Sequence, residues 1–409
     1  MIPLSKPYFT KKETQLFKEV IDTGWVTQGP MVKQFEENFK NYVGSKYAAA
    51  VSSCTTGMHL SLLALGVEPG DFVLTVSHSY IATANSIRHA EAEPLFIDID
   101  STNFNIDVDC LDAFINNKCH YKNGHLYYKD YKKLIQNSPV LRNLRNVNGK
   151  ITCIIVPHQI GIPSNISEIK KRLNKFNIRI IEDAACAIGS SITLNNKIRK
   201  IGNPIGDLVC FSFHPRKILT TGDGGMVTSN NKKLIEQVKI LRNHGMDSEP
   251  DIRAKKNIFM PSLHTVHGYN FRLTDIQAAV GIAQLEKLDE IIVQRNTLSD
   301  IYKDYLSKIE GIEIYTNVKN SSTNWQSYPI TIRTKKKAID LVNYLFKNGI
   351  YAKTGVMNAH MEPPYLKQKW RLPMSELTLE KTVHLPMFHT LRKKEIQFIC
   401  NKVKEFIYS

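Results

Sequence analysis

A lysine that directly follows an apolar run is the residue in this sequence best placed for covalent chemistry. Residues 208–213 predict a buried strand, which stops at His214-Pro215 because proline has no N–H for further strand pairing. Lys217 comes next, and the Thr-Thr-Gly-Asp-Gly-Gly sequence that continues to residue 225 lets the backbone turn tightly. A lysine in a partly desolvated pocket loses some preference for its charged form and can form a Schiff base with a carbonyl. The alternative is a solvated lysine in a loop, and the residues around Lys217 decide between these two interpretations.

Three other loops contain residue types that would complement such a lysine. Residues 52–57 (Ser-Ser-Cys-Thr-Thr-Gly) lead from a strand into a helix, where backbone N–H groups and hydroxyls bind an anion or simply cap the helix. A second strand ends in Glu182-Asp183, and a carboxylate there either holds a proton on a heterocyclic nitrogen or caps a helix. The third loop, residues 78–83, offers Tyr80 either for stacking on a flat ring or for packing. A phosphate site, a carboxylate, an aromatic ring and a Schiff-base lysine are together what pyridoxal phosphate requires.

The pattern of apolar segments indicates how these loops are brought together. Short apolar strands alternate with helices, which predicts an α/β fold whose mainly parallel sheet is covered on both faces and binds ligands at the carboxyl ends of its strands. A helix capped by Thr274, with Gln277 three places on, runs with breaks to about residue 309, and a smaller α+β unit follows it. We place the boundary between the two units near Gln294. The seven expected strands are residues 48–51, 72–76, 94–97, 151–156, 178–181, 208–213 and 226–228.

Composition narrows the class of protein. The 409 residues are 42% hydrophobic and 22% charged, as in ordinary globular proteins, and no run is apolar enough to span a membrane. The N-terminal residues show no export signal, so we expect a cytoplasmic protein. The seven cysteines include no Cys-x-x-Cys pair, which argues against a disulfide framework and against a metal site. The net charge of +16 is compatible with nucleic acid, an anionic membrane face or an anionic small substrate.

One segment departs from the alternating pattern. Residues 116–150 are polar and basic, with tyrosines interleaved among the lysines and arginines. Such a mixture can stack on bases and contact phosphates, but we favour an exposed excursion between two strands.

These motifs, in this order, resemble the DegT/DnrJ/EryC1/StrS family of sugar aminotransferases. The resemblance covers nearly the whole chain. It implies the fold of PLP-dependent transferases of fold type I, with a large domain at residues 1–294 that includes an N-terminal arm, and a small C-terminal α+β domain at residues 295–409. The matching segments are residues 2–7, 24–30, 182–185, 211–225, 242–245 and 268–279.

The same resemblance implies roles for individual residues. Lys217 would carry the Schiff base and shuttle the proton, and Asp183 would pair with the pyridinium nitrogen of pyridoxal 5'-phosphate (PLP, or PMP when aminated). Tyr80 matches the ring-stacking aromatic, and Asn270 matches an asparagine that reaches the phosphate of a neighbouring subunit, which implies a homodimer with shared active sites. The positions that match phosphate contacts are Thr55 and Ser212, with the backbone amides of Cys54 to Thr56.

Two positions differ from the family pattern. Cys186 stands where relatives commonly have a glutamine that contacts the phenolic oxygen of the cofactor, and a thiol is a much weaker hydrogen-bonding group. Cys54 stands where relatives commonly have glycine, which narrows the phosphate loop.

The reaction implied is transfer of the amino group of L-glutamate, which leaves 2-oxoglutarate, to a keto group of a nucleotide-linked deoxysugar. The product would be an amino sugar for a surface polysaccharide such as an O-antigen, or for a glycosylated compound. We expect no nucleic-acid or membrane partner and no metal. Two alternatives stay open: a PLP- or PMP-dependent sugar dehydratase of the same family, in which histidine replaces the lysine, and a non-catalytic regulatory or nucleic-acid-binding relative.

Overall fold

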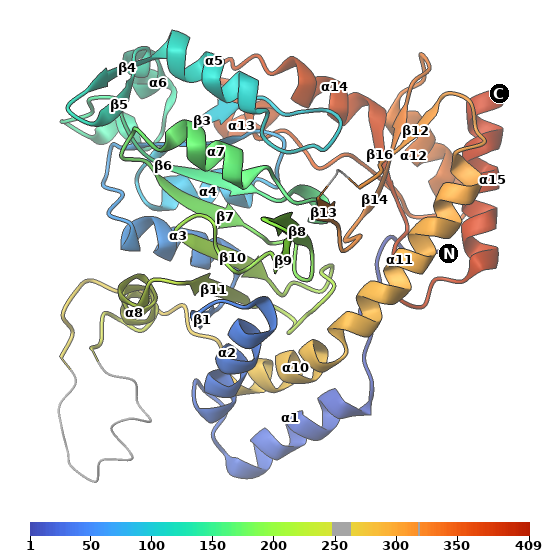
Figure 1. Ribbon diagram of the computed structural model, residues 1–409, viewed down its shortest axis with the longest axis horizontal. Coiled ribbons are helices and arrows are strands. Elements are labelled where there is room, and N and C mark those ends of the chain that lie inside the picture. Colours follow the sequence, from blue (N-terminus) through green and yellow to red (C-terminus); the bar gives the residue numbers. More distant parts are fainter. Residues whose placement is uncertain (248–262, 318–319) are drawn as a thin grey trace.

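The computed structural model describes residues 1–247, 263–317 and 320–409, and its largest element is one mixed sheet (Figure 1). The strands of the sheet are β1 (Tyr47–Val51), β2 (Phe72–Val76), β3 (Glu93–Ile97), β4 (Cys119–Lys122), β5 (His125–Tyr128), β6 (Lys150–Pro157), β7 (Arg179–Asp183), β10 (Leu208–Ser212) and β11 (Gly225–Ser229). Seven of them follow the order β1-β11-β10-β7-β6-β2-β3, and β4 and β5 extend the sheet beside β6. The pairs from β10 to β3 are parallel, whereas β11 runs antiparallel to β1 and β10. The expected mainly parallel sheet is therefore confirmed.

Helices cover both faces of this sheet, because its strands alternate apolar side chains between two cores. In β2, Phe72 and Leu74 belong to the core on one face, whereas Val73 belongs to the core on the other face. The first core includes side chains of α5 and α7, and the second includes side chains of α3, α4 and α8. Over the β1-β11-β10 end, α2 and α10 pack on the same face as α5 and α7. The bounds are α2 (Pro30–Val43), α3 (Cys54–Ala64), α4 (Ala82–His89), α5 (Val108–Lys118), α7 (Ile166–Leu173), α8 (Lys232–Leu241) and α10 (Asp275–Glu286).

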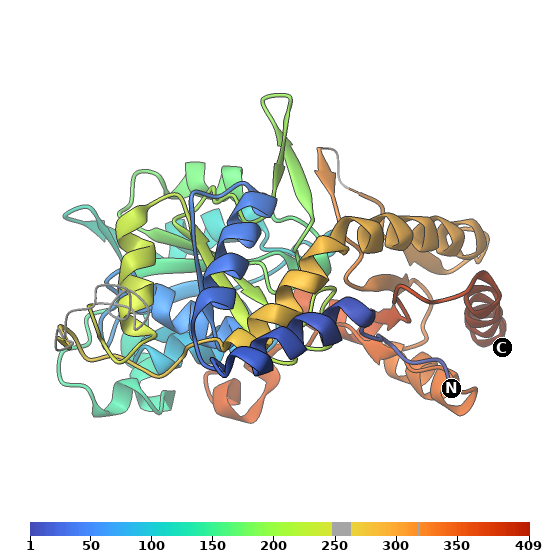
Figure 2. The same ribbon diagram turned by 90° about the horizontal axis from the view of Figure 1, so that it is seen from below.

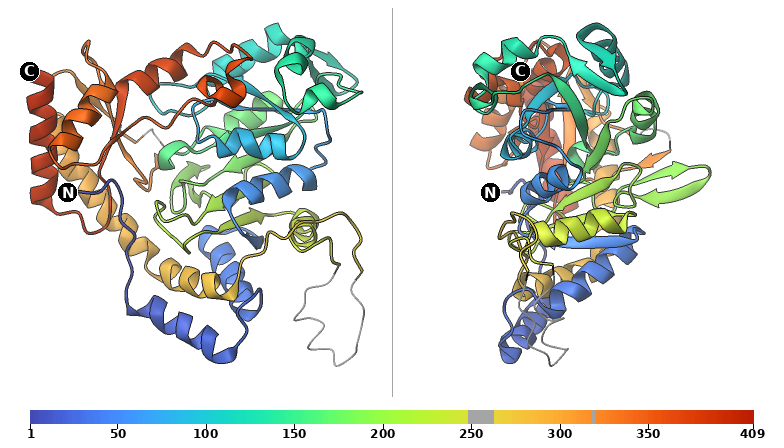
Figure 3. Two further views of the ribbon diagram at one scale, coloured as in Figure 1. Left: turned by 180° about the vertical axis from the view of Figure 1, so that it is seen from behind. Right: turned by 90° about the vertical axis from the view of Figure 1, so that its left-hand side faces the viewer.

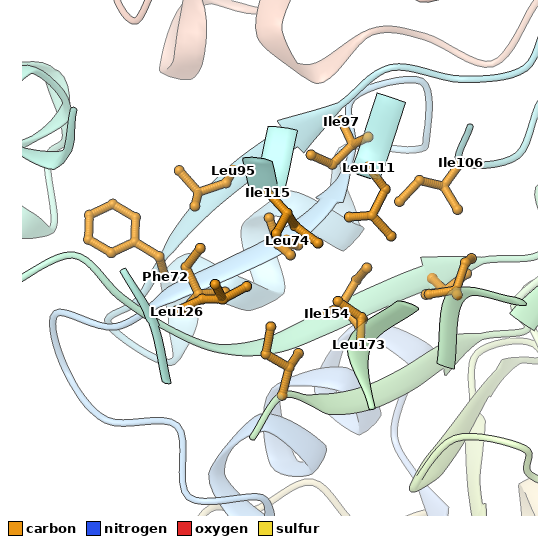
Figure 4. Packing of buried hydrophobic residues seen from close by; sticks show 14 of the residues in the cluster. Phe72, Leu74, Leu95, Ile97, Ile106, Leu111, Ile115, Leu126, Ile154 and Leu173 are labelled. Carbon is orange, nitrogen blue, oxygen red and sulfur yellow. The ribbon is translucent and has the colours of Figure 1, made fainter. Parts of the chain in front are cut away.

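The polar segment at residues 116–150 is part of the core, so the expectation of an exposed excursion is wrong for its apolar residues. It forms the hairpin β4–β5, then helix α6 (Tyr131–Asn137) and a 3-10 turn, η1 (Leu141–Asn143). Leu126 pairs with Ile151 of β6 and is buried in the same cluster as Phe72 (Figure 4). The many lysines lie on the outer face of the segment, so its composition did not indicate that its apolar residues are buried.

A second, smaller unit follows the helix pair α10 and α11 (Leu288–Leu306), which break at Lys287. In the described residues, its sheet has the order β12-β14-β16-β15 and is antiparallel throughout. Leu288 of α11 lies in the core of the large sheet, whereas Leu298 lies in the core of the smaller unit. The elements described after α11 are β12 (Ile312–Ile314), β13 (Ser321–Ser322), β14 (Tyr328–Ile332), α12 (Ala338–Lys347), β15 (Lys353–Thr354), η3 (Ala359–Met361), α13 (Pro363–Leu366), α14 (Pro373–Lys381), β16 (Thr382–Leu385) and α15 (Lys393–Tyr408).

The N-terminal arm joins the two units. Ile2 exchanges backbone hydrogen bonds with Gly349 and Tyr351, and the carbonyl of Leu4 accepts from Met387 N–H, before the chain turns back to helix α1 (Lys11–Thr23) on the large unit (Figure 3). The arm therefore contacts the smaller unit over its first residues.

Side chains also connect the smaller unit to the large sheet. The ring of His78, just after β2, bonds to Asn358 at 2.9 Å, and the hydroxyl of Ser77 bonds to His360 at 2.6 Å. Between the units a hairpin, β8 (Ser191–Leu194) and β9 (Lys197–Lys200), projects from the body, and β13 pairs with it (Figure 2). Within the described residues, no helix is long and apolar enough to cross a membrane.

The packing of the 116–150 segment leads to a stability prediction. Leu126→Ala should lower the free energy of unfolding by about 2–5 kcal/mol, because it removes a 2% exposed side chain from the core and leaves a cavity. Lys122→Ala, on an exposed residue of the same hairpin, is the matched control and should cost little. Urea unfolding of the two variants measures both effects, and equal stability of the two would contradict the assignment.

Candidate active site

Lys217 lies in the loop after β10 and points at the loop that follows β7. Its Nζ donates a hydrogen bond to Cys186 Sγ at 3.0 Å. Burial lowers the pKa of Lys217, but Cys186 and Asp183 nearby outweigh burial, so the pKa lies above its ordinary value. The expectation that desolvation makes this lysine easier to deprotonate is wrong in this arrangement. The ammonium form is the one that these neighbours stabilise.

Asp183 ends β7 in the middle of the parallel part of the sheet and is only 6% exposed. Its carboxylate accepts hydrogen bonds from Thr83 Oγ1 at 2.8 Å and from the Ala185 N–H at 3.1 Å. Cys54 Sγ is a weak donor 3.9 Å from Asp183 Oδ1, the oxygen that also accepts from Ala185. Burial, and then the Asp183 charge, raise the pKa of Cys54 well above its ordinary value, so Cys54 is a neutral thiol. These donors hold a buried carboxylate in one orientation.

The N-terminus of α3 presents free backbone donors beside this carboxylate. Ser53 and Thr56 form a capping box, so the Thr56 side chain is engaged in the cap. Among the described residues, no hydrogen-bond acceptor faces the N–H groups of Cys54 and Thr55. A Cβ on Gly225, the first residue of β11, would lie 2.7 Å from Cys54 N, so only glycine fits where β11 passes this helix end. Two unpaired N–H groups at a helix N-terminus suit a phosphate.

The other residues expected at the site lie around this helix end. Ser212 pairs with Gly225 across β10 and β11, which places it at the same edge. Asn270 is exposed, and the carbonyl of its neighbour Phe271 accepts from the Ser52 N–H at 2.9 Å. Tyr80 is 68% exposed and lies three residues before Thr83, which bonds Asp183. Direct contacts join Lys217 to Cys186 and Asp183 to Cys54, and the charge of Asp183 acts on Lys217. Neighbouring residues connect the remaining expected residues to this group: Thr55, Thr56, Ser212, Tyr80 and Asn270.

Sequence reasoning missed two residues of the smaller unit that hold the site loops. Gln326 accepts from the Ile218 N–H at 3.1 Å and donates to the Arg216 carbonyl at 2.7 Å, so it clamps both sides of Lys217. Asn324 donates to the carbonyl of Cys186 at 2.9 Å. No sequence signal could have found them, because they lie outside every strand-end motif. Thr83, also missed, stood in the 78–83 segment that was singled out for Tyr80.

Comparison with known proteins shows the family of the chain. The profile of the DegT/DnrJ/EryC1/StrS aminotransferase family matches residues 7–404. The chain belongs to this family. An uncharacterised protein of Methanocaldococcus jannaschii is 32% identical over 99% of this chain and 97% of its own, and the GDP-perosamine synthase of Escherichia coli O157:H7 is 29% identical over 99% and 98%. The aminotransferase TlmJ from Streptoalloteichus hindustanus superposes with a TM-score of 0.82 at 25% identity, covering 100% of this chain and 99% of its own.

Members of this aminotransferase family use pyridoxal phosphate, and the fold is that of the fold type I enzymes. Helicobacter pylori PseC, 23% identical over 100% of this chain and 99% of its own, has the same fold with a TM-score of 0.83. The residues described above fit the cofactor: free N–H groups for its phosphate, a buried carboxylate for its ring nitrogen and a lysine for its carbonyl carbon. Within the described part of the chain, no group of three or more His, Cys, Asp or Glu side chains is arranged to hold a metal ion.

The Thr83 contact leads to a prediction about cofactor affinity. Thr83→Val keeps the shape of the side chain but removes the hydroxyl that donates to Asp183, so the carboxylate loses one of the hydrogen bonds that fix its orientation. We expect the dissociation constant for pyridoxal phosphate to rise by about tenfold, from the value of a hydrogen bond to a charged group. Absorbance titration measures it. Thr297→Val, which removes a hydroxyl on exposed α11, is the control, and an unchanged constant in Thr83→Val would rule out the positioning role.

Proposed function

We propose that this protein transfers the amino group of L-glutamate to a keto group of a nucleotide-linked deoxysugar, with Lys217 as the residue that carries the chemistry. The observation that supports this most strongly is the placement of Lys217, whose Nζ lies 3.0 Å from Cys186, three residues after the buried carboxylate of Asp183. In the sugar dehydratases of this family, histidine replaces that lysine, and the lysine here favours amino transfer.

Each residue would have one task. When bound, pyridoxal phosphate supplies an electrophilic carbon and a ring that accepts electrons. Asp183 would hold the proton on the ring nitrogen, and Thr83 would keep that carboxylate aligned. Lys217 would bond to the electrophilic carbon and, once released, would move a proton at the carbon that exchanges the amine. Its ammonium form is stabilised by Cys186 and Asp183, so it needs these neighbours displaced or neutralised before it can accept a proton.

The phosphate would lie at the N-terminus of α3. The N–H groups of Cys54 and Thr55, the Thr55 hydroxyl and Ser212 would bind it, and the helix dipole favours its charge. Thr56 would contribute by holding this helix end in place, because both its N–H and its hydroxyl are already engaged with Ser53. Tyr80, exposed beside the carboxylate loop, would stack on the ring.

Two observations support a nucleotide-linked substrate: the positive charge of the chain and the names of its relatives. The chain carries a net charge of +16, and Arg216 beside Lys217 is exposed, with a side chain that forms no ion pair or hydrogen bond with any described residue. Cations at the mouth of a site raise the local concentration of an anionic substrate. Relatives named GDP-perosamine synthase, in Escherichia coli O157:H7 and Vibrio cholerae, and a spore coat polysaccharide biosynthesis protein of Bacillus subtilis favour an amino sugar for a polysaccharide.

The absorbance spectrum of the bound cofactor provides a test of the proposed reaction. The purified protein with pyridoxal phosphate should show an absorbance band that L-glutamate changes, and Lys217→Ala should lose both the band and the turnover. Removing a group that acts as both nucleophile and base costs about three orders of magnitude or more in rate. Lys308→Ala, on an exposed lysine of the smaller unit, should behave as the wild type. Turnover by Lys217→Ala at the wild-type rate would refute the proposal.

We also propose a homodimer in which Asn270 completes the phosphate site of the neighbouring subunit. Asn270 is exposed beside the Ser52 loop of its own chain, as a residue that serves a partner would be. Lys217→Ala and Asn270→Ala homodimers, mixed and allowed to exchange subunits, should form heterodimers with one intact site. The mixture should recover up to about a quarter of wild-type turnover, since half of the dimers would be mixed. Recovery no greater than the sum of the two variants would show that sites are not shared.

A further inference from the structure

An unpaired lysine of the smaller unit lies opposite Lys217. Lys353 begins β15, the edge strand of the small sheet, and pairs with His384 of β16. Its side chain forms no hydrogen bond or ion pair with any residue that the structure describes. Unpaired lysines are ordinary on a surface, but this one is half-buried and lies within electrostatic range of Lys217 and Arg216.

Strand geometry shows which way Lys353 faces. Residues two apart on a strand share a face, so the Lys353 side chain lies on the side where a Cβ of Gly355 would point. That Cβ would lie 3.4 Å from the ring of His78, in the loop that leads from β2 to α4, the helix that contains Thr83. His384, directly across from Lys353, shares the same face. Lys353 and His384 therefore face the loops of the candidate active site.

Charges around Lys353 are mostly positive. Burial lowers the pKa of Lys353 most, Cys186 opposes this effect, and Lys217 and Arg216 then lower the pKa further. His384 is 2% exposed and its Nδ1 has no hydrogen-bond partner. Burial and Lys353 hold the pKa of His384 well below its ordinary value, so its ring is neutral at pH 7 and retains one N–H to donate. An ammonium and a ring N–H without partners, in one buried place, are complementary to an oxyanion.

We propose that Lys353 and His384 bind a carboxylate of the amino donor. The donor must bring its amine to Lys217, and a carboxylate of a small amino acid lies only a few bonds from that amine, so its site must be close to Lys217. The phosphates of a nucleotide sugar are separated from the reacting keto carbon by the sugar ring, which places them nearer the mouth and the exposed Arg216. This inference rests on the proposed transfer from an amino acid donor.

The test separates the two possible anions. Lys353→Met and Lys353→Arg, both loaded with pyridoxal phosphate, are titrated with L-glutamate by cofactor absorbance, and with GDP by calorimetry as a diphosphate probe. Lys353→Met should raise the dissociation constant for L-glutamate by about 10- to 100-fold, from the loss of a hydrogen bond to a charged group, and leave GDP affinity within about twofold. Lys353→Arg should restore most of the glutamate affinity, because it keeps the charge. Lys347→Met, on an exposed lysine of α12, is the matched control.

Three results would overturn the inference: unchanged glutamate affinity in Lys353→Met, a loss confined to GDP, or an equal loss for both ligands, which would indicate a damaged fold. Circular dichroism and the unliganded cofactor band serve as the fold check, and Lys353→Gln provides a second variant if Lys353→Met fails it. A wild-type protein that does not respond to L-glutamate would refute the proposed function itself. A wild type that responds together with an unaffected Lys353→Met would refute only the carboxylate site.

Discussion

A buried carboxylate at the centre of the sheet governs the arrangement of the candidate site. An ionised Asp183 at 6% exposure is stable only where hydrogen-bond donors or cations compensate for its lost hydration. The donors come from separate segments: Thr83 from the first turn of α4, Ala185 from the loop after β7, and the weak thiol of Cys54 from the start of α3. Each of these loops is thereby positioned relative to the same two oxygen atoms. The site geometry follows from the need to satisfy one charge in the core.

The lysine loop is positioned differently, because it is held from the smaller unit. Gln326 bonds to the backbone on both sides of Lys217, and the partners are 108 and 110 residues apart in the sequence. Asn324 holds the backbone of Cys186 in the same way. The distance between Lys217 and the Asp183 loop therefore depends on how the smaller unit packs on the sheet. Movement of that unit would change the lysine position without changing any residue of the large core.

The sequence was sufficient for the features that depend on local pattern. Apolar strands between helices predicted the parallel sheet, and the strand-end rule singled out the segments of Lys217, Asp183 and Cys54. The sequence was insufficient where a contact depends on packing between distant segments, as for Gln326. It was also insufficient where a segment with many charged residues on one face has an apolar face as well, as around Leu126. The predicted direction of the shift in the Lys217 pKa was wrong because it, too, depends on packing between distant segments. Desolvation follows from position in a strand, but the compensating Cys186 and Asp183 contacts arise only when the two loops meet.

The segment that contains Asn324 and Gln326 is strained at the residue between them, and specific contacts offset the cost of that strain. Trp325, between Asn324 and Gln326, has a φ of 52°, a conformation that costs a bulky residue about 1–2 kcal/mol. The buried Arg295 donates to the Trp325 carbonyl at 2.6 Å, and the indole stacks on Tyr328 with ring centres 5.3 Å apart. A left-handed residue at this point reverses the chain, so that Asn324 reaches the Cys186 loop and Gln326 reaches the Lys217 loop. The arginine and the tyrosine packed against Trp325 offset the cost of this conformation and so help to hold both amides at the two loops.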